Sequence, residues 1–317
     1  MSGFAYLVRG GKVERPILKE ALGKDADLSW VHLTTNDERA QIWLGGEAKL
    51  QPQIIDALTA SETRPRCDAV GPGALINLRG LSSEAMAASD PLASIRMYAH
   101  GSTVFSVTRK PLDALTTVRE EVEAGRILDP GDLIAAIAQA ITEQLDPMVA
   151  ELGDLLDDCE EQIATHRAFE LRRLVNRTRV KAIGLRRFLF PQRAALEKLA
   201  GLPVEWLRDD DRLHLSAAAD RAARMAEELE SIRERSALTH ETLTDLRAEQ
   251  IDQRSLIVAV VAMVFLPLTF ITGLLGMNVE GIPFAHAPWA FWGVFWLCVV
   301  IAVAVTGYFL QRHWFDR

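Results

Sequence analysis

Residues 256–275 read LIVAVVAMVFLPLTFITGLL, twenty positions without a charged side chain. A second uncharged run, AFWGVFWLCVVIAVAVTGYFL, occupies 290–310. Each run meets the requirement of roughly 20 apolar residues for a helix that crosses a hydrocarbon core of about 30 Å. One such run is also compatible with the buried core helix of a soluble protein. Two of them, joined by the fourteen residues of 276–289, favour a pair of membrane-spanning helices.

The positive charges around these runs predict their orientation in the lipid bilayer. Arg247 and Arg254 precede the first run, Arg312 and Arg317 follow the second, and the loop 276–289 contains no Lys or Arg. Because positively charged flanks stay on the cytoplasmic side, we expect both termini in the cytoplasm and the loop outside. The first residues lack the apolar core and cleavage site of a signal peptide, so the long N-terminal part is expected to be intracellular.

Composition argues against several classes of protein. The 317 residues include 43 acidic and 35 basic side chains, for a net charge of −8, and show no basic stripe interleaved with aromatics. Nucleic acid is therefore not an expected partner. No Gly-rich phosphate loop, Gly-x-Ser-x-Gly or His-Glu-x-x-His motif occurs, so we do not expect an enzyme. The seven histidines and three cysteines show no metal-ligand spacing, and no resident cofactor is expected.

The N-terminal residues 1–130 are expected to form a cytoplasmic α/β domain. Short runs rich in β-branched and aromatic residues, bounded by Gly, Asp or Pro, are typical of strands. Such runs occupy 4–8, 29–33, 73–78, 94–101 and 103–109. The stretch 37–58 between them reads as helical.

Residues 131–254 are expected to form a helical stalk, because apolar side chains recur there at spacings of three and four. Pro147 and Pro191 punctuate this part. From 212 to 275 there is one proline and one glycine, so we expect a single helix of about 96 Å, at ~1.5 Å per residue. The fold class is thus an α+β membrane protein. Its transmembrane domain is expected at 255–317, with helices at about 255–275 and 290–310 and the outer loop 276–289.

One face of the first apolar run is small and polar. Helical spacing brings onto this face, which we call the polar stripe, Asp252, Ser255, Ala259, Ala262, Leu266, Thr269 and Gly273. Continued toward the cytoplasm, the stripe takes in Asp245 and Glu241. Small residues are typical of contact faces between membrane helices. Repeated by symmetry, the same face instead lines a water-filled pore with carboxylates at its cytoplasmic end. This second interpretation requires a homo-oligomer, because two helices cannot enclose a pore.

The segment FLPLTFITGLLGMN, residues 265–278, lies at the end of the first of two C-terminal spans and after a long acidic helix. In this position it resembles the signature of the CorA family of divalent-cation transport proteins. The resemblance implies a funnel-shaped homopentamer in the bacterial cytoplasmic (inner) membrane, with the polar stripe as the pore wall. It also implies that Asn278, together with Gly276 and Met277, rings the outer mouth and selects the ion.

Within the family, the segments 191–193 (PQR), 202–206 (LPVEW) and 276–283 (GMNVEGIP) are similar to the zinc-transporting branch. This likeness implies zinc as the transported ion and leaves proton coupling open. A magnesium, cobalt or nickel channel of the same family is the alternative. Glu280 departs from the Gly expected in the zinc branch, and with His286 it is expected to meet the incoming cation in the outer loop. A membrane-anchored sensor, through which nothing crosses, is the non-transport alternative.

Overall fold

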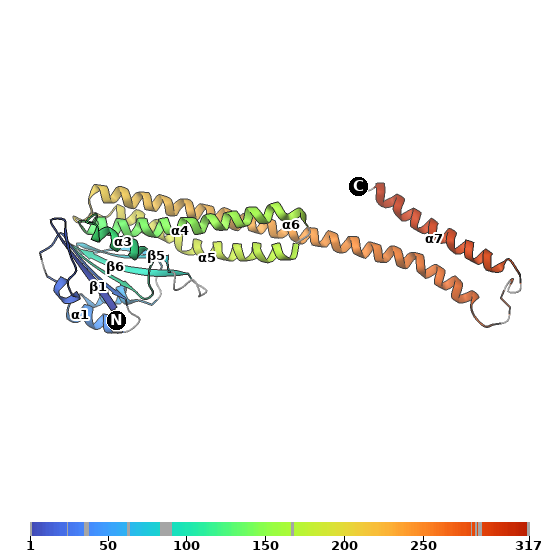
Figure 1. Cartoon of the computed structure of the whole chain (residues 1–317), viewed down its shortest axis with the longest axis horizontal. Coiled ribbons are helices and arrows are strands. Elements are labelled where there is room, and N and C mark those ends of the chain that lie inside the picture. Colours follow the sequence, from blue (N-terminus) through green and yellow to red (C-terminus); the bar gives the residue numbers. More distant parts are fainter. Residues whose placement is uncertain are drawn as a thin grey trace. The chain divides into compact units, whose positions relative to one another are not determined.

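The computed structural model describes all residues except 1, 24, 35–37, 62–63, 83–90, 166–167, 280, 283, 285–286 and 316–317. Internal contacts divide the chain into two units, Met1–His240 and Glu241–Arg317. Figure 1 draws both units, and each is described here by itself. The boundaries at 130 and 254 that the sequence suggests remain predictions.

A seven-stranded sheet forms the α/β part of the first unit (Figure 1). Its strands are β1 (Ser2–Arg9), β2 (Lys12–Glu14), β3 (Leu28–Thr34), β4 (Arg66–Val70), β5 (Gly73–Leu81), β6 (Leu92–His100) and β7 (Thr103–Thr108), with a 3-10 turn η1 (Leu18–Ala21) after β2. The order is β2-β1-β3-β7-β6-β5-β4. β3 and β7 pair in parallel, and the other neighbours pair antiparallel. All five predicted strands are confirmed. The two edge strands were not predicted, because KVE has only three residues and RCDAV is interrupted by Arg66 and Asp68.

Two short helices, α1 (Arg39–Gly46) and α2 (Pro52–Thr59), replace the single helical stretch expected at 37–58. Lys49 between them has a positive φ of 53°, which ends the helical path. Pro52 then starts α2, where its fixed φ and missing N–H are tolerated. Apolar side chains of both helices pack with those of β1, β3, β6 and β7 in one hydrophobic core.

The remaining helices follow the sheet in the sequence. They are α3 (Ala114–Glu123), α4 (Pro130–Glu161), α5 (Ala168–Ala200), α6 (Asp209–Leu275) and α7 (Ala290–Phe315), with a 3-10 turn η3 (Gln162–Thr165) after α4. Pro147 and Pro191 lie inside α4 and α5 instead of interrupting them. A proline costs a helix one hydrogen bond and some strain. In α4 the flanking Leu145 and Val149 are fully buried, so tertiary packing outweighs this local cost.

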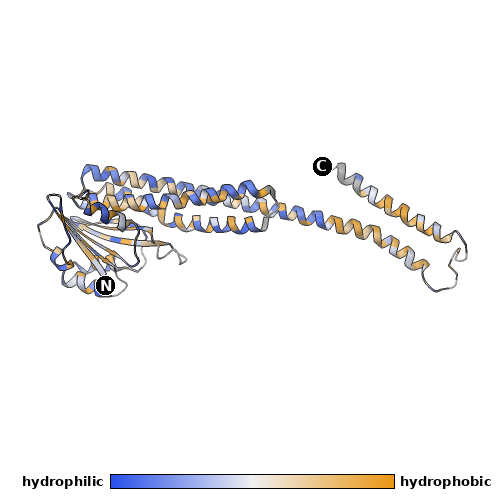
Figure 2. Cartoon of the chain, in the orientation of Figure 1, coloured by the Kyte–Doolittle hydropathy of each residue, from blue (hydrophilic) through white to orange (hydrophobic). Residues whose placement is uncertain are grey.

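Helix α6 runs without interruption from Asp209 to Leu275, which confirms the long helix predicted for 212–275. Its C-terminal part and most of α7 are hydrophobic (Figure 2). Both are long and apolar enough to cross a membrane, and neither apolar segment is buried inside the chain. The core helix of a soluble protein would be covered by its own chain. These segments need lipid or another copy to remove them from water.

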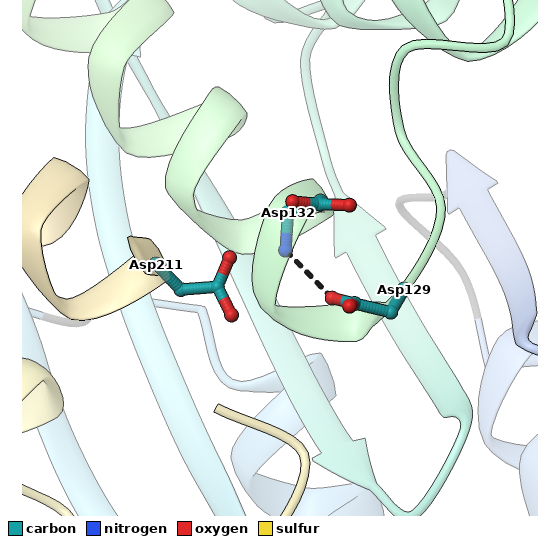
Figure 3. A group of neighbouring side chains, drawn as sticks. All are labelled: Asp129, Asp132 and Asp211. Carbon is teal, nitrogen blue, oxygen red and sulfur yellow. Dashed lines mark hydrogen bonds between the residues drawn. The ribbon is translucent and has the colours of Figure 1, made fainter. Parts of the chain in front are cut away.

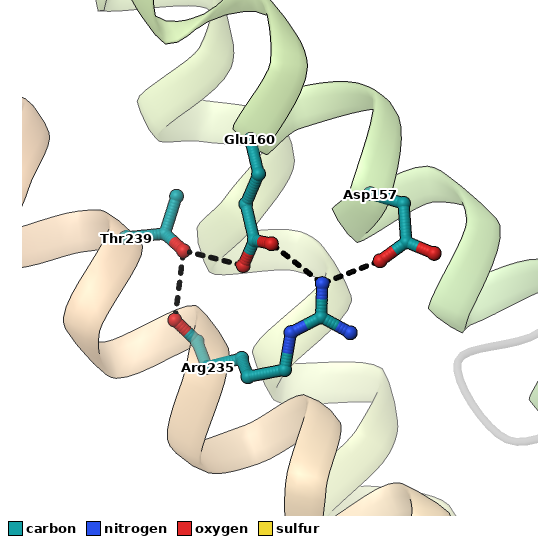
Figure 4. A network of polar contacts seen from close by, with 4 residues as sticks. All are labelled: Asp157, Glu160, Arg235 and Thr239. Atoms are coloured by element: carbon teal, nitrogen blue, oxygen red, sulfur yellow. Dashed lines mark hydrogen bonds and ion pairs between the residues drawn. The ribbon is translucent and has the colours of Figure 1, made fainter.

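A polar network joins α6 to the end of α4 (Figure 4). Arg235 of α6 donates to the carboxylates of Asp157 and Glu160 of α4, at 2.5 Å from Glu160. The hydroxyl oxygen of Thr239 lies 3.0 Å from Glu160 Oε1 and 2.8 Å from the carbonyl oxygen of Arg235. The acidic run 157–161 is helical and forms the last turn of α4, where it holds α6.

Replacing Arg235 by Ala should lower the melting temperature of the full chain in detergent. The variant loses two charge-assisted hydrogen bonds, which we expect to reduce stability by about 1–3 kcal/mol. Arg224→Ala is the matched control, because it removes an exposed arginine from the same helix. Equal melting curves for the two variants would show that the network adds nothing to stability.

Candidate functional site

The C-terminal part of α6 is not buried by its own chain. Every member of the polar stripe is exposed, and so are Asp245 and Glu241 further toward the N-terminus. Leu266 is 71 % exposed, which shows that nothing in its own chain covers this face. On the opposite side exposure is mixed, because Ile257 and Val261 are 63 % and 50 % exposed. Half-buried side chains there are Leu256, Val260, Val264, Leu268 and Ile271. The stripe deduced from spacing is therefore a continuous accessible surface of α6.

A shallow groove of about 420 Å³ lies on this surface. Its lining residues are Ala262, Phe265, Leu266, Thr269 and Phe270, three of which belong to the polar stripe. The Thr269 hydroxyl donates to the carbonyl oxygen of Phe265 at 2.7 Å. Because its proton is used inside the helix, Thr269 presents only oxygen lone pairs outward. An oxygen in this state accepts from water or contacts a cation.

The end of α6 explains the glycine of the Gly276-Met277-Asn278 tripeptide. The Gly276 N–H donates to the carbonyl oxygen of Thr272 at 2.9 Å. A Cβ on Gly276 would lie 2.9 Å from that same oxygen, closer than a side chain tolerates. Asn278 follows the helix end and is exposed, as is Met277. Glu280 and His286, expected to contact the cation in the outer loop, lie outside the described residues.

A carboxylate cluster in the first unit was not singled out as a site by the sequence. Asp129, Asp132 and Asp211 bring oxygen atoms within 4.8 Å of one another (Figure 3). Their oxygens accept hydrogen bonds from backbone N–H groups at the N-termini of α4 and α6. Asp129 accepts the Asp132 N–H at 3.0 Å and pairs with Arg208 at 2.8 Å. Asp132 accepts the Leu128 N–H, and Asp211 accepts the Arg208 N–H. The cluster is therefore built as helix caps.

Burial raises the pKa of Asp211 from its ordinary value of 3.8 to about 6, against the opposing hydrogen bond from the Arg208 N–H. The charges of Asp129 and Asp132 act in the same direction as burial. The folded chain therefore holds a proton on Asp211 more tightly than the unfolded chain does. Above pH 6 the carboxyl group is ionised, and its buried charge lowers the stability of the fold by the full amount. This destabilising effect disappears as the pH falls toward 4.

The structure is that of a membrane protein in which one helix begins in a soluble α/β unit and ends as a spanning segment with a polar face. Residues 25–312 match the protein family described as "CorA-like Mg2+ transporter protein". This match covers most of the sequence. The chain therefore belongs to the CorA family of divalent-cation transport proteins, as the residues at 265–278 predict.

Individual relatives are similar to this chain in sequence, and solved structures are similar to it in fold. The zinc transport protein ZntB of Pectobacterium atrosepticum is 29% identical over 309 residues, which cover 97% of this chain and 94% of that protein. The divalent cation transporter CmaX of Pseudomonas aeruginosa is 33% identical over 266 residues, 83% and 80% of the two chains. A solved full-length CmaX structure matches with a TM-score of 0.80 at 30% identity, over 98% of both chains. The CorA magnesium transporter of Methanocaldococcus jannaschii shares the fold, with a TM-score of 0.83 at 18% identity over 98% of both.

Replacing Asp211 by Asn should stabilise the protein at neutral pH. Asn keeps an oxygen for the Arg208 N–H and removes the buried charge, so we expect a gain on the order of 1–3 kcal/mol. The gain should shrink as the pH falls from about 6 to about 4, where the wild-type carboxyl is itself protonated. Melting curves of the full chain across this range measure the effect. Asp210→Asn, an exposed change in the same helical turn, is the control, and a gain that does not depend on pH would contradict the assignment.

Proposed function

We propose that this protein carries zinc across the bacterial cytoplasmic membrane, through a central pore lined by the polar stripe of α6. The observation that carries the proposal is the exposed stripe, which runs along α6 and ends at Gly276-Met277-Asn278. Zinc is supported by two relatives named zinc transport protein, each 29% identical over 97% of this chain. The cargo is the ion itself, and no bond is made or broken during its passage.

The proposed assembly is a homopentamer with both termini in the cytoplasm. A single α6 presents one accessible polar face, and only several copies around an axis enclose a pore. The resemblance of residues 265–278 to the CorA family supports five copies. The arginines that flank the two spans, with a loop free of Lys and Arg between them, support the orientation. A monodisperse monomer by mass measurement in detergent would contradict the assembly.

At the outer mouth, two features of the described structure favour a cation. The last turn of a helix carries unpaired carbonyls and a partial negative charge. The exposed amide of Asn278 follows directly and supplies an oxygen that is neutral. In the pentamer, five such oxygens replace part of the hydration shell of the arriving ion. Gly276 permits the close turn, and Met277 separates it from Asn278.

Along the pore wall, the stripe changes character from outside to inside. Thr269 offers an oxygen, and Leu266 forms a hydrophobic constriction that gates the pore by excluding water. Smaller side chains follow at Ala262, Ala259 and Ser255. Asp252, Asp245 and Glu241 then present carboxylates at the cytoplasmic end, where rings of acidic groups concentrate cations.

A magnesium channel of the same family is the second candidate. The family description names Mg2+, and CmaX is named only as a divalent cation transporter. The two candidates differ in driving force, since a proton gradient drives a coupled transporter and the membrane potential drives a channel.

Reconstitution into liposomes that contain a zinc-sensitive dye tests the proposal, with magnesium indicator in parallel vesicles. We expect zinc entry that rises with an inward proton gradient. Asn278→Ala should reduce zinc entry at least tenfold while the oligomer stays assembled, and Val279→Ala, at the next exposed position, should leave it unchanged. Magnesium entry driven by voltage alone would assign the chain to the channel branch. No flux of either ion would overturn transport and favour the sensor.

Replacing Leu266 by Ser should wet the constriction and raise the leak of divalent cations through the closed protein. We expect a several-fold higher flux in the same liposomes without any gradient of protons. Val261→Ser is the matched control, because Val261 is also exposed but lies roughly 140° around the helix from Leu266. A leak that is the same in both variants would show that Leu266 faces lipid.

A further inference from the structure

A pocket of about 680 Å³ lies in the first unit, between the sheet and α5. Six of its lining residues are cationic, namely Arg64, Arg79, Arg96, Arg109, Lys110 and Arg187. None of the lining residues that the structure describes is acidic. This concentration of positive charge is unusual in a chain with a net charge of −8. The pocket is far in sequence from the polar stripe and does not depend on which ion crosses the membrane.

Arg96 distinguishes this pocket from an ordinary basic surface, because it is buried and two of its donor atoms have no partner. It projects from the central part of β6 and is only 3 % exposed. Its Nη2 lies 3.5 Å from the carbonyl oxygen of Ser61, a long contact. Its Nε and Nη1 are buried and have no hydrogen-bond partner. Burying a guanidinium without partners is unfavourable, so these two donors point to a missing acceptor.

Two neighbouring guanidiniums contact backbone carbonyls and an aromatic ring. Arg109 Nη2 donates to the carbonyl oxygen of Thr59 at 2.7 Å. Arg79 Nη2 donates to the carbonyl oxygen of Leu92 at 3.2 Å, and its guanidinium carbon lies 3.8 Å from the centre of the Phe188 ring. These contacts orient the two side chains. Burial lowers the pKa of Arg96 to about 10, and the charges of Arg109 and Arg79 add to the effect.

We propose that this pocket binds a soluble phosphate-bearing anion with two or more negative charges, such as pyrophosphate or a nucleoside triphosphate. Guanidinium forks match phosphate oxygens in pairs, and charge-assisted bonds of this kind are strong. The volume lies within the range of about 300–1,000 Å³ that is usual for small-molecule sites. The anion supplies acceptors to Arg96 Nε and Nη1 and links β6 to Arg187 of α5. The site is thus a cytoplasmic ligand site, separate from the ion pathway.

The test measures binding to the full chain in detergent, with EDTA present so that chelation of divalent cations by the phosphates plays no part. Sodium pyrophosphate and ATP are titrated at constant ionic strength, with sodium chloride as the reference, and the melting temperature is followed. We expect a saturable rise with either phosphate at millimolar concentration or below, beyond the rise with chloride. A rise with ATP alone assigns part of the affinity to the nucleoside. No saturable rise, or the same rise with chloride, would overturn the proposal.

Two variants locate the site. Arg187→Gln removes an exposed charge that lines the pocket, and it should raise the dissociation constant for pyrophosphate about tenfold. Arg177→Gln, an exposed arginine of the same helix that does not line the pocket, should bind as the wild type does. Arg96→Met should abolish the ligand-dependent rise without lowering the melting temperature of the ligand-free chain. Should Arg96→Met fail to fold, the comparison of Arg187→Gln with Arg177→Gln decides, and equal affinities in that pair would refute the assignment.

Discussion

A hydrocarbon core tolerates no unpaired backbone polar group, and this constraint shapes α6 more than any other part of the chain. The helix must cross as an unbroken element, yet it contains Pro267, which removes one backbone N–H from the ladder. Threonine hydroxyls nearby donate back to carbonyls of their own helix, from Thr269 to Phe265 and from Thr272 to Leu268. The hydroxyl protons of Thr269 and Thr272 are thereby satisfied within their own helix. The stripe offers oxygens without exposing unpaired donors to lipid.

The N-terminal part of the same helix belongs to the first unit, where apolar packing and hydrogen bonds to carboxylates hold it. Leu215, Leu229 and Ile232 of α6 are buried apolar side chains, and Arg235 and Thr239 tie the helix to carboxylates of α4. His240 is the last residue of the first unit. The polar network thus stands within a few residues of the point where α6 leaves its packing partners.

Sequence patterns predict those elements of this molecule that depend on the spacing and type of neighbouring residues. Strands with β-branched and aromatic runs, the uninterrupted helix from 212 to 275 and the polar stripe all follow from period and composition. The break between α1 and α2 at Lys49 and the continuation of α4 through Pro147 do not, because burial of neighbours decides them. The arginine pocket was missed for a related reason. Arg79, Arg96 and Arg109 lie on or beside three successive strands of the sheet, and only pairing of those strands brings them together.

The distribution of charge suits a pathway in which a divalent cation must enter and also leave. Attraction between a divalent cation and a ring of carboxylates in a low-dielectric mouth is strong enough to hold the ion. In the proposed pore, the amide of Asn278 supplies only a dipole, so the ion keeps much of its water and is released readily. The carboxylates of Asp252, Asp245 and Glu241 are exposed and precede the apolar run of α6. Water screens them there, and they raise the local concentration of cations without trapping one. In the proposed pore, the neutral oxygen of Asn278 and the exposed carboxylates before the apolar run of α6 thus favour flux over binding.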